Sequence, residues 1–154
     1  MKDEQLRGVL IKANNWDGVF KTLVSTISFV SYNWWVKDID AYLGTDLRIN
    51  SSLNGHVLGT DLTKEIVDLE VIIFGKFVTF PRDYKGNVDI ESYEEFQSSD
   101  AQIILLVVDG YYFEFYFKDT DLTNTVAEIA RRKGFKRVEL IAGENDGRTC
   151  MDVW

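Results

Sequence analysis

The amino-acid sequence predicts a single α+β domain over residues 1–154, with a mostly antiparallel or mixed sheet and helices packed mainly on one face. A chain of 154 residues is about one domain, and no shift in composition divides it. Two strand-like stretches flank Asp109-Gly110, a pair typical of a β-hairpin turn. Apolar stripes with helical spacing alternate with the strand-like stretches, which favours helices packed against a sheet.

The N-terminal stretch is predicted to form a strand over residues 6–12 and then a helix over residues 16–28. Asn14 or Asn15 can cap this helix. Its apolar residues recur at the spacing of one helical face: Trp16, Phe20, Leu23, Val24 and Ile27.

A second strand is predicted over residues 33–37, and residues 38–43 either continue it or pair back onto it. Asparagine, serine and glycine are frequent in residues 44–59. These residue types favour turns, so this stretch is expected to be irregular.

Two elements are expected between residues 60 and 80. Thr60 or Asp61 can cap a short helix that ends at about Val67. A long strand follows over residues 69–80, and Gly75 within it indicates a bulge.

A capping box opens the next helix. Ser92 is followed three residues later by Glu95, and this spacing predicts a short helix over residues 93–98. The hairpin strands follow at residues 101–108 and 111–118, joined by a two-residue turn. The first of them is continuously apolar, so we expect it at a central position covered on both faces.

The last helix has signals at both ends. Asp119 caps it and Gly134 stands at its exit. An apolar stripe runs along it, formed by Leu122, Val126, Ile129 and Ala130. Strands are predicted over residues 136–142 and 148–154, with a turn between them.

Acidic residues outnumber basic ones by 25 to 17, which gives a net charge of −8. Nucleic-acid backbones are polyanions, so no nucleic-acid partner is expected. The basic residues between 131 and 137 do not change this, because the dipole of the preceding helix accounts for the first three. The charge balance instead favours attraction to a basic protein partner.

No membrane association is expected, and the cytoplasm is the expected location. Residues 1–5 are charged and lack the apolar stretch of a signal peptide. The longest apolar run, residues 103–108, is far shorter than the ~20 residues that span a bilayer.

No catalytic residue, cofactor site or metal site is expected, so the protein is not expected to be an enzyme. Phosphate-binding glycine loops and the nucleophile elbow are absent from the sequence. The sequence contains one cysteine, Cys150, and one histidine, His56. Cys150 is interpreted as a small hydrophobic residue in or near a strand, and the alternative is a nucleophile that His56 activates. Residues 144–148 collect oxygen atoms, but they lack the spacing of a calcium loop and are interpreted as a solvated turn.

Five carboxylates gather around the helix predicted over residues 93–98: Asp89, Glu91, Glu94, Glu95 and Asp100. They are interpreted as a solvated face that complements the helix dipole, as a partner-binding surface, or as a catalytic pair, which would require a cleft. Trp35 is a further partner-binding candidate, because Trp34 and Trp35 point to opposite faces of their strand and an exposed tryptophan is a typical interface anchor. The alternative is that both faces are covered.

Five stretches of the chain form a recognisable set: Arg7-Gly8-Val9, Tyr32-Asn33-Trp34-Trp35-Val36, Tyr93-Glu94-Glu95-Phe96, Leu105-Leu106-Val107-Val108-Asp109, and Glu144-Asn145-Asp146-Gly147-Arg148-Thr149 leading to Val153-Trp154. In these stretches the chain resembles a family of uncharacterised proteins from spore-forming bacilli, a domain of unknown function. The resemblance spans nearly the whole chain and is weakest over residues 47–68. It implies a bacterial cytoplasmic origin and brings no assigned activity.

The preferred hypothesis is a non-enzymatic acidic module that binds a basic protein, of the immunity or inhibitor type. Small size, acidity and abundant aromatic residues favour it, since complementary charge accelerates encounter. The alternatives are a small-molecule-binding or sensory domain with a pocket between sheet and helices, and an unrecognised enzyme built on carboxylates.

Overall fold

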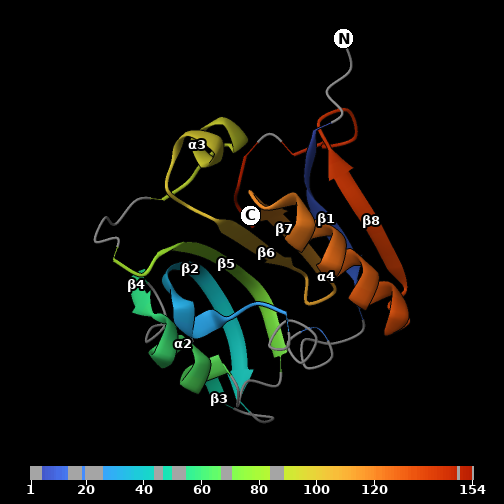
Figure 1. Ribbon diagram of the computed structural model, residues 1–154. Helices are drawn as coiled ribbons and strands as arrows, with labels where there is room; N and C mark the ends of the chain where they lie inside the picture. Colours follow the sequence, from blue (N-terminus) through green and yellow to red (C-terminus); the bar gives the residue numbers. More distant parts are fainter. Residues whose placement is uncertain are drawn as a thin grey trace.

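A computed structural model of the chain describes residues 5–13, 19, 26–43, 47–49, 55–66, 71–83, 89–148 and 150–153 (Figure 1). The helix predicted over residues 16–28 lies almost wholly outside these described residues.

One sheet of eight strands forms the centre of the described chain. Its strands are β1 (Leu6–Lys12), β2 (Tyr32–Leu43), β3 (Leu47–Ile49), β4 (Gly55–Leu58), β5 (Val71–Pro81), β6 (Ile103–Val108), β7 (Tyr112–Phe117) and β8 (Arg137–Ala142). Their order is β3-β2-β5-β6-β7-β1-β8, and β4 also pairs with β2. Every pairing between these described strands is antiparallel. The predicted α+β class with an antiparallel sheet is confirmed.

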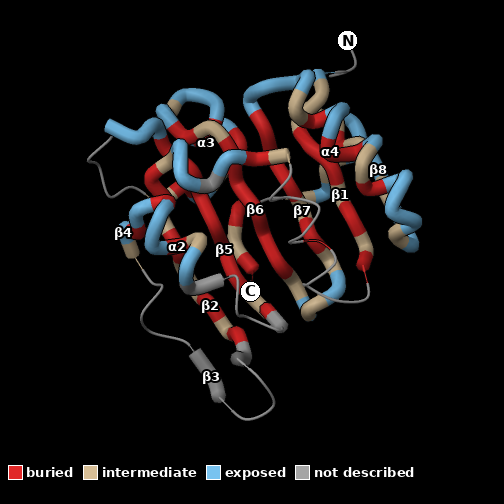
Figure 2. Tube along the Cα trace, turned by 60° about the horizontal axis from the view of Figure 1, so that its bottom comes forward, coloured by how far each residue is buried: buried red, intermediate tan, exposed pale blue. Residues whose placement is uncertain are grey.

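The described helices lie on both faces of the sheet: η1 (Phe29–Ser31), α2 (Gly59–Ile66), α3 (Tyr93–Ser98) and α4 (Thr120–Arg132). Leu62 of α2 and Val126 of α4 join one buried cluster, on what we call the α4 face. Phe96 of α3 joins a second cluster on the opposite side, the α3 face. Figure 2 shows that the central strands are buried over most of their length. The prediction that helices pack mainly on one face holds for α2 and α4, whereas α3 packs on the opposite face.

The stretch expected to be irregular, residues 44–59, contains β3 and β4 in its described part, so this expectation was wrong. Both strands pair with β2, and β4 places His56 opposite Trp35. The hydrogen bonds come from a strand distant in sequence, which local residue types do not signal. Helix α2 begins at Gly59, slightly earlier than expected.

A bulge occurs beside Gly75, but the extra residue is on β2. Lys37 pairs with Lys76 and Asp40 pairs with Phe74, so β2 has one residue more than β5 in this interval. Asp38 lies in the interval with a φ of 56°. Before the bulge, the pairing sets Lys37 and Lys76 side by side on the α3 face.

The predicted hairpin is confirmed, with a longer connection than expected. Val108 pairs with Tyr112, so three residues connect β6 and β7 instead of two. Asp109 and Gly110 have φ values of 56° and 72°, the left-handed region that this residue pair tolerates. Strand β6 is buried almost throughout and lies between β5 and β7, as its continuous apolar sequence predicts.

The predicted end signals of α3 and α4 are present. The Ser92 hydroxyl accepts from the N–H of Glu95 at 3.1 Å, and the Glu95 carboxylate accepts from the N–H of Glu91 at 3.0 Å. Asp119 accepts from two N–H groups in the first turn of α4. Gly134 follows this helix with a φ of 75°.

The final strand predicted over residues 148–154 is absent from the described residues of that range. The free side of β8 is occupied locally, because the Asn145 side chain accepts from the N–H of Ala142 at 2.7 Å and donates to the carbonyl of Leu140 at 3.0 Å. These backbone groups would otherwise be available to form hydrogen bonds with a further strand. The chain instead turns onto the α3 face, and we call residues 145–148 and 150–153 the strap.

Candidate functional site

Two polar clusters lie on the α3 face, where the strap crosses the sheet. A row of paired residues runs there across six strands, from β2 to β8: Lys37, Lys76, Leu106, Glu114, Leu10 and Glu139. Four of these six residues are charged, although the same face holds a hydrophobic core. The strap supplies counter-charges to the row.

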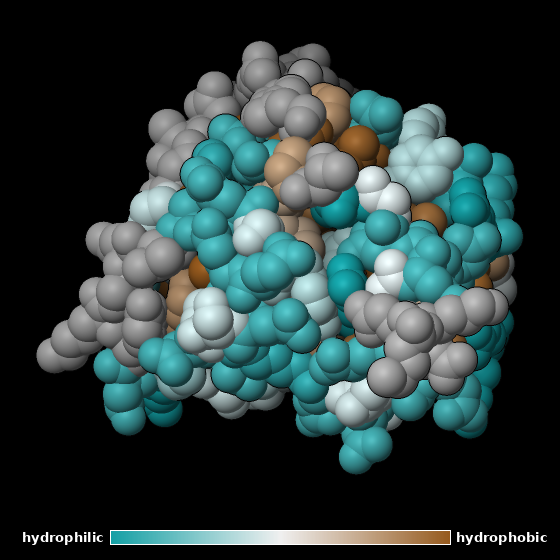
Figure 3. All heavy atoms as spheres, turned by 90° about the horizontal axis from the view of Figure 1, so that it is seen from above, coloured by the Kyte–Doolittle hydropathy of each residue, from teal (hydrophilic) through white to brown (hydrophobic). Residues whose placement is uncertain are grey.

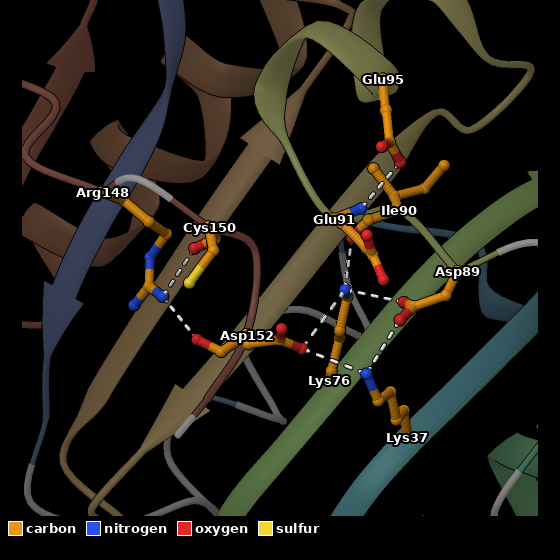
Figure 4. Close-up of polar contacts among 9 residues, drawn as sticks. All are labelled: Lys37, Lys76, Asp89, Ile90, Glu91, Glu95, Arg148, Cys150 and Asp152. Atoms are coloured by element: carbon orange, nitrogen blue, oxygen red, sulfur yellow. Dashed lines mark hydrogen bonds and ion pairs between the residues drawn. The ribbon is translucent and has the colours of Figure 1, made fainter.

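The lysine cluster is centred on Lys76, whose side chain is 0% exposed. Its ammonium donates to Asp89 at 2.8 Å and to the carbonyl of Ile90, and Asp152 of the strap lies 3.8 Å away. Lys37 donates to the other oxygen of Asp89 at 2.8 Å and to Asp152 at 3.3 Å. Figure 4 shows the two ammonium groups converging on the two carboxylates. A buried ammonium is tolerated because it is paired and hydrogen-bonded.

The cluster shifts the pKa values of its members. Burial opposes ionisation of Asp89, but the hydrogen bonds from Lys37 and Lys76 outweigh it and hold the pKa of Asp89 below its usual value. The hydrogen bond to Asp89 raises the pKa of Lys37 well above the usual lysine value, although burial acts in the opposite direction. Asp89 and Lys37 are therefore both charged at neutral pH.

We expect the lysine cluster to stabilise the fold above the acidic range and to lose this effect on acidification. The pKa of Asp89 is lower in the folded protein than in the unfolded chain, so its stabilisation is complete above the unfolded value of about 3.9. It is lost as the pH falls through the folded value, because the unfolded state binds the extra proton. Urea unfolding from about pH 6 to about pH 3 measures this loss. Asp89→Asn should flatten the acidic limb, and an unchanged limb would contradict the assignment.

The arginine cluster is centred on Arg148 of the strap. Its Nε and Nη2 donate to the two oxygens of Glu114 on β7, at 2.7 and 3.0 Å. Its Nη1 donates to the carbonyls of Cys150 and Asp152, so the same guanidinium also fixes the turn of the strap (Figure 4). Burial opposes the charge, but the hydrogen bonds to Glu114 raise the pKa of Arg148 above its usual value.

Asp146 joins the strap to β1 and, at a second point, to β7. Its carboxylate accepts from the Tyr116 hydroxyl at 3.1 Å and from Arg7 Nη1 at 3.2 Å. The Arg7 guanidinium also lies 4.0 Å from the centre of the Tyr93 ring, which links β1 to α3. Burial, followed by the negative charges of Asp146 and Glu114, raises the pKa of Tyr116, so its hydroxyl remains a hydrogen-bond donor.

Apolar and backbone contacts complete the attachment of the strap. Met151 and Val153 are buried in the cluster of the α3 face. The N–H of Met151 donates to the carbonyl of Glu91 at 2.9 Å, which ties the strap to the segment before α3. The strap is thus a structural part of this face.

A pocket of about 420 Å³ opens beside the strap. It is lined by residues of β7, β1, β8 and the strap: Leu10, Glu114, Glu139, Leu140, Ile141, Asn145, Asp146, Gly147, Arg148 and Cys150. Its volume is within the range of ordinary ligand sites.

The profile of one protein family matches residues 6–152, and its description is protein of unknown function (DUF2691). The chain belongs to the DUF2691 family. The resemblance to an uncharacterised family from bacilli is confirmed. The DUF2691 chain is 31% identical over 87 residues to the uncharacterised protein YncE of Bacillus subtilis (strain 168), which is 56% of this chain and 51% of YncE. The chain thus spans about half the length of this relative, and no solved structure matches it.

Two features are absent from the described residues of this DUF2691 protein. None of the described helices has the length and apolar character that a membrane span requires. No three His, Cys, Asp or Glu side chains among the described residues gather in an arrangement that could hold a metal ion.

The structure divides the six residues predicted as a partner-binding site of this DUF2691 protein. Asp89 is engaged in the lysine cluster. The other four acids are exposed around α3: Glu91, Glu94, Glu95 and Asp100. Trp35 is half-buried and packs against the core of the α3 face, and its indole N–H has no partner among the described residues.

The structure also separates the two residues considered as a nucleophilic pair. His56 is exposed on β4, which pairs with β2 at one side of the sheet. Cys150 is exposed in the strap, beside a pocket on β7, β1 and β8. Because Cys150 is exposed, its interpretation as a small hydrophobic residue was wrong, although it does lie near strands, beside the pocket on β7, β1 and β8.

Sequence reasoning missed the charged residues on which the strap depends, chiefly Lys76, Glu114, Arg148 and Asp152. Two of them carried a signal. Lys76 and Glu114 each interrupt a stretch of apolar and aromatic residues in a strand of the DUF2691 chain. A charged residue at such a position requires a partner when it is buried.

Proposed function

We propose that the protein is a non-enzymatic, acidic protein-binding module of the immunity or inhibitor type, which acts in the cytoplasm and binds a basic protein. The exposed acids around α3 carry the proposal: Glu91, Glu94, Glu95 and Asp100. We call them the α3 acidic surface. Seen from above the orientation of Figure 1, where α3 lies, the described surface is predominantly hydrophilic (Figure 3).

The acids of the α3 face divide into two groups, and this division supports the proposal. One group forms ion pairs with lysine or arginine side chains within the fold: Asp89, Glu114, Asp146 and Asp152. In contrast, the carboxylates of Glu91, Glu94 and Asp100 form no hydrogen bond or ion pair with the described residues. Glu91 and Glu94 are therefore available to attract a basic protein and to raise its association rate, whereas the charge of Asp100 also acts on Lys118.

The reactive groups of the two clusters support a non-enzymatic role. The Lys76 ammonium already has acceptors in Asp89 and Ile90. All three guanidinium nitrogens of Arg148 donate within the fold. An attacking lysine would need an accessible lone pair on its nitrogen, and a substrate-clamping arginine would need two free N–H donors, whereas Arg148 retains one.

We test the proposal by recovering a partner from the native host and then measuring its binding rates with purified components. Replacing Glu91 and Glu94 together by glutamine should lower the association rate constant by about tenfold at low salt, because steering depends on surface charge. The matched control replaces two exposed acids on α4, Asp121→Asn with Glu128→Gln, and should leave the rate nearly unchanged. Equal effects of the two pairs, or an association insensitive to salt, would contradict the proposal.

A further inference from the structure

The pocket beside the strap has an apolar floor and a polar wall. Leu10 and Ile141 form part of the floor, and both belong to or pack against the core of the α3 face. Three carboxylates and one guanidinium line the pocket: Glu114, Glu139, Asp146 and Arg148. The lining charge is therefore net negative, although Arg7 and Arg137 contact two of the carboxylates from outside the lining.

Most of the side-chain donors in the wall are already used. Arg148 uses four of its five N–H donors within the fold, through Nε, both N–H groups of Nη1 and one N–H of Nη2. The Asn145 amide donates one of its two N–H groups to Leu140 and accepts from Ala142. The described lining leaves an anionic ligand one N–H of Arg148 and one N–H of Asn145, beside three carboxylates that repel a carboxylate or phosphate.

The acceptors in the wall keep spare capacity. Each oxygen of Glu114 accepts one bond from Arg148, and a carboxylate oxygen can accept two. Glu139 accepts from Arg137 through one oxygen at 2.8 Å, and its other oxygen has no donor among the described residues. The hydrogen bond from Arg137 lowers the pKa of Glu139, so this acceptor is charged at neutral pH.

The sheet register places the two glutamates on either side of Leu10. Leu10 pairs with Glu114 on β7 and with Glu139 on β8, so the three side chains share one face and one cross-strand row. Strands are about 4.8 Å apart, so the two glutamate Cα atoms are separated by roughly 10 Å. An aliphatic stem laid on Leu10 would carry its end group between two carboxylates.

We propose that this pocket binds an alkylammonium or alkylguanidinium group, with the aliphatic part on Leu10 and Ile141 and the cation between Glu114 and Glu139. The ligand is either a small free amine or a lysine or arginine side chain of another protein. The site is separate from the α3 acidic surface, because neither Glu91 nor Glu94 lines the pocket.

The sole cysteine gives a direct readout, since Cys150 is exposed and lines the pocket. We titrate the full chain with n-butylammonium chloride and n-butylguanidinium chloride at constant ionic strength and measure the rate of Cys150 alkylation by iodoacetamide. Amide chemical shifts of Leu10, Gly147 and Cys150 are followed in parallel. Saturable slowing of alkylation and saturable shifts at these amides are expected. Sodium valerate has a stem of similar length and the opposite charge, and it should do neither.

Variants localise the binding. Glu139→Gln should weaken butylammonium binding about two- to fivefold, the range for one partly exposed ion pair. Glu144→Gln changes a residue of the turn that lies outside the lining, so butylammonium binding should be unchanged. The double variant Glu91→Gln, Glu94→Gln should also leave butylammonium binding unchanged. This second control distinguishes failure of the pocket proposal from failure of the proposed function. Equal responses to butylammonium and valerate, or shifts that rise linearly without saturation, would overturn the proposal.

A peptide identifies the source of the cation. Acetyl-Gly-Gly-Lys-Gly-Gly-amide presents a lysine side chain without other charge. Binding at least as tight as that of butylammonium supports a protein side chain as the natural ligand. Binding of butylammonium alone supports a small amine. If neither compound protects Cys150, the pocket does not recognise cations.

Discussion

Asp89→Ala is expected to lower the free energy of unfolding by about 3–5 kcal/mol, the cost of leaving a buried charge without its partner. The Lys76 ammonium is fully buried and is 2.8 Å from Asp89. Without this carboxylate it retains the carbonyl of Ile90 and an Asp152 oxygen at 3.8 Å, which is too long for a hydrogen bond. Urea unfolding at neutral pH measures the difference.

Replacing the other partner is expected to cost much less. Lys76→Met keeps most of the buried volume and removes the charge, while Asp89 retains its hydrogen bond to Lys37. We expect a loss of less than about 2 kcal/mol, because an apolar residue of similar size often replaces a buried ion pair at little cost. The asymmetry between the two variants is the test. Equal losses would show that Lys76 contributes through its charge as much as Asp89 does.

Gly8→Ala is expected to lower the free energy of unfolding by more than about 4 kcal/mol, an effect reserved for a specific structural conflict. Gly8 lies in β1, between β7 and β8, where the register with β8 shifts. A Cβ atom at this position would lie 1.7 Å from the carbonyl oxygen of Phe115 and 2.7 Å from its carbonyl carbon. Both are backbone atoms of β7, so relief requires the two strands to separate. Urea unfolding followed by circular dichroism gives the loss.

Gly147→Ala is the matched control for this prediction. A Cβ at Gly147 meets no atom within 4 Å, and its φ lies outside the left-handed region. Its free energy of unfolding should stay within about 0.5 kcal/mol of the parent. If Gly8→Ala proves too unstable to unfold reversibly, loss of its near-ultraviolet circular dichroism while Gly147→Ala keeps that signal gives the same answer. A native-like Gly8→Ala protein would contradict the close approach of β1 and β7.

Elements defined by local signals were predictable. Helix α4 follows from its cap at Asp119 and its exit at Gly134, both of which act within one turn of the helix ends. The hairpin follows from Asp109 and Gly110. Its loop is longer than predicted, and the carbonyl of Ile73 on β5 accepts from the N–H of Gly110. Such a bond between distant segments lies beyond local turn rules.

Elements defined by distant partners were not predictable. The alternation of residues 148–154 resembles a strand, but the Asn145 side chain takes backbone groups at the edge of β8. Asp89 looked like part of a solvated acidic face, because the lysines that bind it, Lys37 and Lys76, come from two other strands. A single sequence shows the charge of these residues and not the register that brings them together.

The order of synthesis determines when the strap can dock on the sheet. Every described strand precedes it, so the ribosome delivers the sheet before Arg148, Met151 and Asp152 exist. Until then this face has α3 but lacks the strap, so Glu114 has no counter-charge from Arg148 and the apolar side chains that Met151 and Val153 cover are exposed. We therefore expect a nascent chain to expose a chaperone-binding surface on this side until the strap docks. Variants that weaken the strap should prolong this exposure.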